Sequence, residues 1–301
     1  MSEEKIKVPR FRDSGFTIRW EQGRWAEDII MDAINNSKKL RAIPYGRSQI
    51  GPKEKDKIKE YYRKYRRDEK YGKRPDILVF DIETYTEISD QLPEDPTTTP
   101  EDELEDIVKE SLCAIEAENS MWYAKKMPDY GKKPPFKSKK LTLPRIWIKE
   151  EDVSRLLEWE KYYKKKIWVI QVLMDEAFMA SLDWVMTQVK KIEEKAGLKG
   201  IKSSKIQREI GIIIEHQAYS DSATGYSTTK IVYTVPHSIA VKFGEIVEEA
   251  KLSPDIIIED NGHIIPYTRF VGGKLRINNA AIEAMIKGEM PNQSYNLTKY
   301  I

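Results

Sequence analysis

The stretch Leu112-Cys113-Ala114-Ile115-Glu116-Ala117-Glu118-Asn119-Ser120 carries two acids at the end of an apolar run. The apolar half predicts a central β-strand, and residues two apart on a strand point to the same face, about 6 to 7 Å apart. Glu116 and Glu118 would then flank one site. Like charges on one face of an apolar strand repel each other unless a cation joins them, so the spacing favours a metal site. The alternative is a strand that ends at Ile115, with both acids in a solvated turn.

A second apolar strand is predicted at Ile77-Leu78-Val79-Phe80, directly after Arg74-Pro75-Asp76. Asp76 stands at the mouth of this strand, where its carboxylate could complete the site of Glu116 and Glu118. Hydrolysis of a phosphodiester by a metal-activated water needs two or three converging carboxylates, which hold Mg²⁺. Asp76, Glu116 and Glu118 can supply such a set of carboxylates. The alternative for Asp76 is an acid that caps the strand beside Arg74.

The segment between the two strands is strongly acidic. Residues 87–110 contain ten acids and one lysine, and three prolines interrupt the first half. We interpret the segment as a surface insertion, with a helix from Glu101 onward.

Hydrophobic periodicity predicts the remaining elements. Helices are expected at residues 24–40, 52–72, 150–165, 176–195 and 238–250, and strands at 145–148, 167–173, 210–215 and 230–235. The succession of strand, helix and strand from 145 to 173 predicts a crossover unit in a mixed or parallel sheet. We therefore expect an α/β fold with a mixed central sheet flanked by helices, a helical N-terminal region and C-terminal β/α elements.

Composition narrows the class of protein further. The 301 residues include 51 Lys and Arg against 49 Asp and Glu, so the net charge of +2 says little about partners. The single cysteine, Cys113, excludes an internal disulfide framework and a cysteine-rich zinc site, and the three histidines show no ligand spacing. No uninterrupted apolar run of about 18 residues is present. We expect a cytoplasmic protein without a membrane segment.

The two quoted stretches resemble the PD-(D/E)XK motif of type II restriction endonucleases, and the resemblance extends over about residues 70–185. It implies a restriction-endonuclease-like fold that cuts double-stranded DNA with Mg²⁺, as a homodimer on palindromic sites. Residues 1–301 would form one domain, with the catalytic core at about 70–185 and DNA-recognition additions at 1–69 and 200–301. One domain boundary is conceivable near Gly200.

Carried over residue by residue, the resemblance makes Asp76 the first metal-binding acid and Glu116 the second. Glu118 stands where the motif usually has lysine, which leaves open whether Glu118 or a nearby Lys125 or Lys126 helps to activate water. Glu27, on the predicted N-terminal helix, could add a metal ligand, as such a helix does in some similar enzymes. An ordinary acid on the helix surface is the simpler interpretation of Glu27.

Two basic segments, Lys53–Arg74 and the loop Lys132–Lys140, are candidates for contacts to DNA phosphates. Polar loops near residues 47 and 204 are candidates for reading bases. The individual candidates are Arg47, Ser48, Lys132, Lys133, Lys137, Lys139, Ser204 and Lys205. Each could instead belong to an ordinary solvated face. Two other functions remain open: a structure-specific or repair nuclease of the same fold, and a DNA-binding protein that has lost catalysis.

Overall fold

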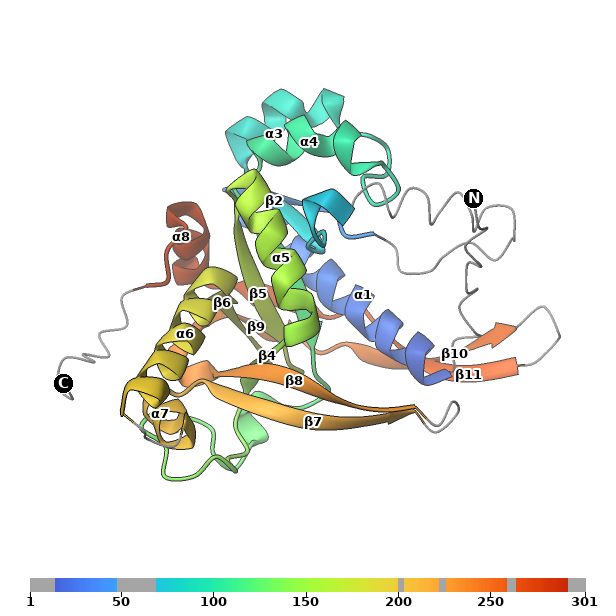
Figure 1. Cartoon of the computed structure of the whole chain (residues 1–301). Coiled ribbons are helices and arrows are strands. Elements are labelled where there is room, and N and C mark those ends of the chain that lie inside the picture. The colour runs from blue at the N-terminus through green and yellow to red at the C-terminus, as the bar shows by residue number, and fades with distance from the viewer. Residues whose placement is uncertain (1–13, 48–68, 200–202, 222–225, 259–263, 292–301) are drawn as a thin grey trace, which may run out of the picture.

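The computed structural model describes residues 14–47, 69–199, 203–221, 226–258 and 264–291 (Figure 1). A seven-stranded sheet forms its centre, in the order β1-β2-β3-β5-β6-β9-β12. These strands are β1 Leu40–Pro44, β2 Ile77–Asp81, β3 Cys113–Asn119, β5 Lys166–Val172, β6 Glu176–Ser181, β9 Val241–Glu248 and β12 Lys274–Ile277. Only β3 and β5 pair in parallel, so the sheet is mixed and the predicted α/β class is confirmed.

Two smaller sheets accompany the central one. The first has the order β4-β8-β7, and the second is the hairpin of β10 and β11. Their bounds are β4 Arg145–Lys149, β7 Ile213–Asp221, β8 Tyr226–Pro236, β10 Lys251–Ile258 and β11 Ile264–Val271. In Figure 1 the β7–β8 hairpin runs along the lower side of the molecule.

Helices cover both faces of the central sheet. The α-helices are α1 Ser14–Asn35, α3 Ile82–Ile88, α4 Glu101–Glu110, α5 Glu150–Tyr163, α6 Leu182–Lys199, α7 Ser203–Ile210 and α8 Asn279–Lys287. The 3₁₀ turns are η1 Glu69–Tyr71, η2 Ser89–Gln91, η3 Ala124–Lys126 and η4 His237–Ile239. No described helix is both long enough and apolar enough to cross a membrane.

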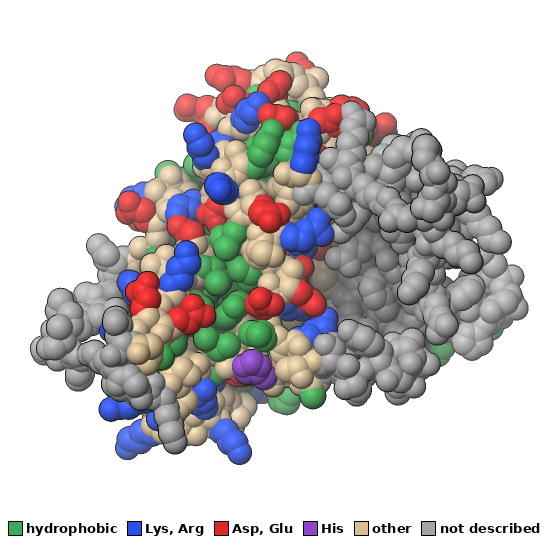
Figure 2. Space-filling model, viewed as in Figure 1, with side chains coloured by type: hydrophobic (Ala, Val, Ile, Leu, Met, Phe, Trp, Pro, Cys, Tyr) green, Lys and Arg blue, Asp and Glu red, His purple; other side chains and the backbone are tan. Residues whose placement is uncertain are grey.

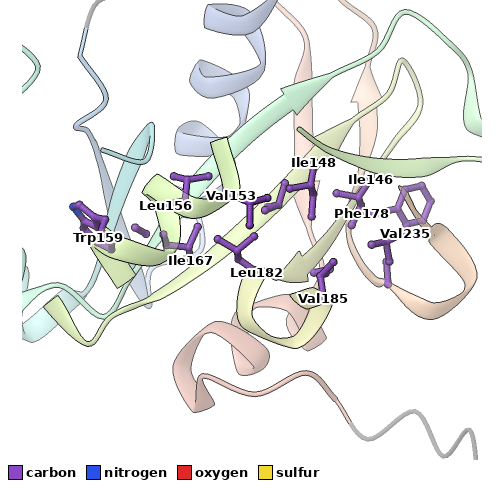
Figure 3. Close-up of a cluster of buried hydrophobic side chains, with 14 of the residues drawn as sticks. Ile146, Ile148, Val153, Leu156, Trp159, Ile167, Phe178, Leu182, Val185 and Val235 are labelled. Carbon is purple, nitrogen blue, oxygen red and sulfur yellow. The ribbon is translucent and has the colours of Figure 1, made fainter. Parts of the chain in front are cut away.

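Each face of the sheet has its own hydrophobic core. One core contains side chains of α4, α5 and α6, and Figure 3 shows Leu156 and Trp159 of α5 packed in it with Ile167 of β5. The other core contains side chains of α1 and α8 together with Trp168 of β5. Because successive residues from Ile167 to Ile170 enter opposite cores, this stretch of β5 is apolar on both faces, as expected for a strand covered on both sides.

The prediction of a helix over residues 176–195 is wrong at its start. Glu176–Ser181 forms strand β6, every residue of which is buried, and the helix begins at Leu182. Ala177 and Met179 enter one core, whereas Phe178 and Ala180 enter the other. Since both faces are apolar, the strand shows no polar alternation that could distinguish it from a helix.

Three further predictions need correction, and a fourth lies mostly outside the described residues. The N-terminal helix ends at Asn35, and the predicted helix over 238–250 is the turn η4 followed by strand β9. The predicted strand at 145–148 is β4, which pairs with β8, so the parallel crossover runs from β3 through α5 to β5. The predicted helix over 52–72 lies outside the described part of the chain for residues 52–68. Its described residues 69–71 form the 3₁₀ turn η1.

The acidic segment is more than a surface insertion. A helix does begin at Glu101, as predicted, but Glu101, Leu104 and Val108 are buried against the body of the protein. The other acids of the segment stay at the surface, and Figure 2 shows acidic side chains gathered over α3 and α4. The segment therefore contributes to the core on the α5 side of the sheet.

Glu160 of α5 provides a test of this packing. Burial, and next the charge of Asp183, raise the pKa of Glu160 from 4.5 to about 7, and its buried Oε2 has no hydrogen-bond partner. The folded state thus holds the proton more tightly than the unfolded state, so wild-type stability falls as the pH rises from about 4.5 to about 7. We expect Glu160→Gln to be more stable than wild type at pH 8 by about 1 to 2 kcal/mol, with a smaller difference at pH 5.

Urea unfolding at both pH values measures this effect. Glu158→Gln is the matched control, since Glu158 is exposed on the same helix. An equal gain for Glu160→Gln at pH 5 and pH 8 would contradict the assigned cause.

Candidate active site

Asp76 and Glu116 lie side by side on neighbouring strands. Strands β2 and β3 are antiparallel with Ile77 opposite Ile115, and the same register continued by one residue brings Asp76 opposite Glu116. Asp76 Oδ2 accepts a hydrogen bond of 2.8 Å from the backbone N–H of Ala117. The structure thus brings together the two acids that the sequence analysis placed on separate strands.

The backbone of Asp76 is held from the other side by the end of β1. The N–H groups of Tyr45 and Gly46 both donate to Asp76 O, at 2.8 and 2.9 Å. A Cβ at Gly46 would lie 2.8 Å from Asp76 Cα, which is closer than real Cβ contacts allow. A residue without a side chain is therefore required where β1 passes Asp76.

Lys73, which the sequence analysis did not single out, contacts this pair. Its Nζ lies 2.5 Å from Glu116 Oε1 and 3.1 Å from Asp152 Oδ1 at the start of α5. Burial by itself would lower the pKa of Lys73, but the neighbouring carboxylates of Glu116, Asp76 and Asp152 raise it above its ordinary value, so Lys73 is charged. Its only signal in the sequence was its place three residues before Asp76, within a stretch interpreted as phosphate-binding.

Glu118 has a different partner. Its carboxylate lies 3.1 Å from Lys149 Nζ at the end of β4. Lys125 Nζ is 3.7 Å from Glu176 Oε1, and Lys126 Nζ lies 3.8 Å from the centre of the Tyr123 ring. Among the described residues, the lysine that contacts Glu116 is thus Lys73 and neither Lys125 nor Lys126.

The acids of the site affect one another's ionisation. Burial, followed by the charges of Glu116 and Glu27, raises the pKa of Asp76 well above its ordinary value. Burial also raises the pKa of Glu116, against the lowering effect of Lys73. For Glu27 on α1, burial and then the charges of Asp28 and Glu116 raise the pKa to about 7. Glu27 therefore belongs electrostatically to the same site.

The donor set at this site fits a hard divalent cation in its chemistry. Carboxylate oxygens are the ligands that Mg²⁺ takes, and Glu116 Oε2 is buried with no hydrogen-bond partner. Within the described residues, no three His, Cys, Asp or Glu side chains are already gathered closely enough to hold an ion. Lys73 supplies the positive charge beside Glu116 in this arrangement.

The candidate DNA-contacting residues are spread over several elements. Lys132, Lys133 and Lys137 are exposed on the loop before β4, although Lys132 pairs with Asp129 at 2.5 Å, and Lys139 is half-buried. Ser204 and Lys205 lie in the first turn of α7 and not in a loop as expected, while their contact with DNA stays a prediction. Arg47 is half-buried after β1, and Ser48 lies outside the described residues.

Comparison with known protein families gives a match over the first part of the chain. Residues 1–132 match the family model described as AccI restriction endonuclease. This region contains Glu27, Lys73, Asp76, Glu116 and Glu118. No curated protein and no solved structure matches the chain. The match supports a restriction endonuclease, that is, a nuclease that binds DNA.

Proposed function

We propose that the chain is a type II restriction endonuclease that hydrolyses phosphodiester bonds of double-stranded DNA with Mg²⁺. The observation that carries the proposal is the pair of Asp76, which is half-buried, and Glu116, which is buried, in register across β2 and β3, inside the region that matches the AccI family model. Bringing two carboxylates together away from water is unfavourable, as their raised pKa values reflect. A cation bound between them would remove that cost.

In this proposal Asp76 and Glu116 hold Mg²⁺, and Glu27 is a further candidate ligand. The bound ion would polarise the scissile phosphate and lower the pKa of an attacking water. Hydrogen bonds hold Asp76 in place: the Ala117 N–H orients its carboxylate, and the N–H groups of Tyr45 and Gly46 bind its main-chain oxygen. The Asp76 carboxylate is then already oriented when substrate arrives.

Lys73 is proposed to take the part that the motif gives to lysine. It is a cation in direct contact with Glu116, so it can face the negative charge that develops on the phosphate. Glu118 is proposed to hold the ammonium group of Lys149, its ion-pair partner, beside the site.

Lys73→Met should therefore lower the Mg²⁺-dependent cleavage rate by about 10²-fold, because one group that stabilises transition-state charge is lost. Cleavage rates at saturating DNA measure the effect, and circular dichroism checks that the variant is folded. Lys125→Met, which removes a lysine paired with Glu176, is the matched control and should stay within about threefold of wild type. Loss of activity in the Lys125 variant with retention in the Lys73 variant would reverse the assignment.

The function itself is tested by incubating the protein with bacteriophage DNA in Mg²⁺ and in EDTA. Discrete fragments that form only with Mg²⁺ would support a site-specific endonuclease. A smear would favour a structure-specific or repair nuclease, and intact DNA would favour a binding protein without catalysis.

A two-fold dimer is proposed because a palindromic site is most simply met by a symmetric protein. Analytical ultracentrifugation with and without DNA tests the oligomeric state.

A further inference from the structure

A groove opens directly beside the proposed active site. It has a volume of about 710 Å³ and lies between the end of β3, the loop before β4 and the first residues of β7. Its wall includes Glu118 and Asn119 of β3, so it begins two residues along the strand from Glu116. Pockets of this size accept a ligand as large as a nucleotide.

Trp122 at the rim of this groove is unusually exposed. Its side chain is 66% accessible, although indole rings are usually largely buried, and Met121 beside it is 48% accessible. The backbone around Trp122 is well anchored, because Met174 N–H donates to Trp122 O at 3.0 Å and Ala124 N–H donates to Asp175 at 2.6 Å. A fixed chain that presents an exposed indole offers a flat surface for stacking an aromatic ring.

The floor of the groove carries a polar group in a fixed orientation. Gln171 of β5 is 1% exposed and lines the groove. Its Oε1 accepts a hydrogen bond of 3.2 Å from the backbone N–H of Trp147, which turns the amide NH₂ into the available donor. Such a donor can recognise the carbonyl or ring-nitrogen acceptors on the edge of a base.

The charges around the groove favour a phosphate. The two acids on its wall have cationic partners: Glu118 lies 3.1 Å from Lys149, and Glu215 lies 3.6 Å from Arg145. Lys139 and Lys140 also line the wall. Burial, and next the charge of Arg208, lower the pKa of Lys139, against the raising effect of Glu215.

We propose that this groove receives one unpaired nucleotide of the substrate DNA, with the base stacked on Trp122, the base edge facing Gln171 and a phosphate facing Lys139 and Lys140. The inference rests on the proposed function, since it takes DNA as the substrate. It goes further by stating that the enzyme binds a nucleotide outside the duplex next to the cleavage site, which costs least where the nucleotide is already unpaired.

The test uses two short duplexes that contain one 2-aminopurine, either paired with thymine or opposite an abasic site, titrated with protein in EDTA. We expect wild type to bind the duplex with the unpaired base about fivefold more tightly or better, and to quench its fluorescence on binding. Trp122→Ala should remove the preference and the quenching, and Trp122→Phe should restore part of both. Ile286→Ala, which truncates an exposed side chain on α8, is the control and should match wild type.

Equal binding of the two duplexes by wild type, or an undiminished preference in Trp122→Ala, would overturn the inference. Cleavage of phage DNA with Mg²⁺ by the same preparations separates this failure from failure of the proposed function. If DNA is cut but no preference is seen, only the nucleotide site is lost. If neither duplex is bound and no DNA is cut, both proposals fail.

Discussion

Replacing Asp76 with asparagine is expected to lower Mg²⁺-dependent DNA cleavage by about 10³-fold or more. The amide cannot provide a carboxylate ligand, and losing a ligand that stabilises transition-state charge is worth several kcal/mol, at about 1.4 kcal/mol for each factor of ten in rate. Single-turnover cleavage of a mapped DNA fragment over a range of Mg²⁺ concentrations measures the effect.

The same substitution should leave the fold at least as stable as in wild type. An asparagine oxygen can still accept from the Ala117 N–H, and the repulsion between Asp76 and Glu116 disappears. A loss of activity without a loss of stability thus separates a role in the reaction from a structural role. Asp90→Asn, at an exposed acid of η2, is the matched control. Wild-type cleavage by the Asp76 variant would refute the metal site.

Glu101→Ala is expected to have the largest effect on stability, about 3 to 5 kcal/mol. The carboxylate is fully buried, forms an ion pair with Arg74, and accepts hydrogen bonds from the hydroxyl groups of Tyr45 and Tyr163. The variant would leave the Arg74 guanidinium in the core without its counter-charge. Arg74 lies two residues before Asp76, and the Tyr45 N–H donates to Asp76 O. The ion pair of Arg74 and Glu101 therefore also supports the backbone of the proposed active site.

Urea unfolding monitored by tryptophan fluorescence measures this loss as a shift of the midpoint. Glu103→Ala, at an exposed acid of the same helix, is the control and should change stability by less than about 0.5 kcal/mol. A midpoint for Glu101→Ala close to that of the control would show that the buried pair contributes nothing to folding.

The two strands that carry the proposed active site could be predicted from the sequence because their signals are local. A short apolar run followed by acids indicates a strand end in any context, and β2 and β3 lie where these runs predict. The helix that begins at Glu101 could also be predicted, because Pro100 precedes it and its first turn is acidic. Strand β6 was not, since its two apolar faces hide the period that distinguishes a strand from a helix.

The sequence could not predict which charged side chains form ion pairs with one another. Lys73 and Glu116 are 43 residues apart, and Lys149 and Glu118 are 31 apart, so only the packing of α5 and β4 against the sheet decides which lysine meets which acid. The burial of Glu101 depends in the same way on tertiary structure.

The sequence by itself therefore determined the class of fold and the acids from which a metal site could be built, because periodicity and strand ends depend on near neighbours. The tertiary structure decided that Asp76 lies opposite Glu116 and that Lys73 forms an ion pair with Glu116. It also decided that the charge of Glu116 raises the pKa of Glu27 and that Glu118 pairs with Lys149. The physical reason is that electrostatic interactions act through space, between groups whose separation along the chain carries no information about their distance.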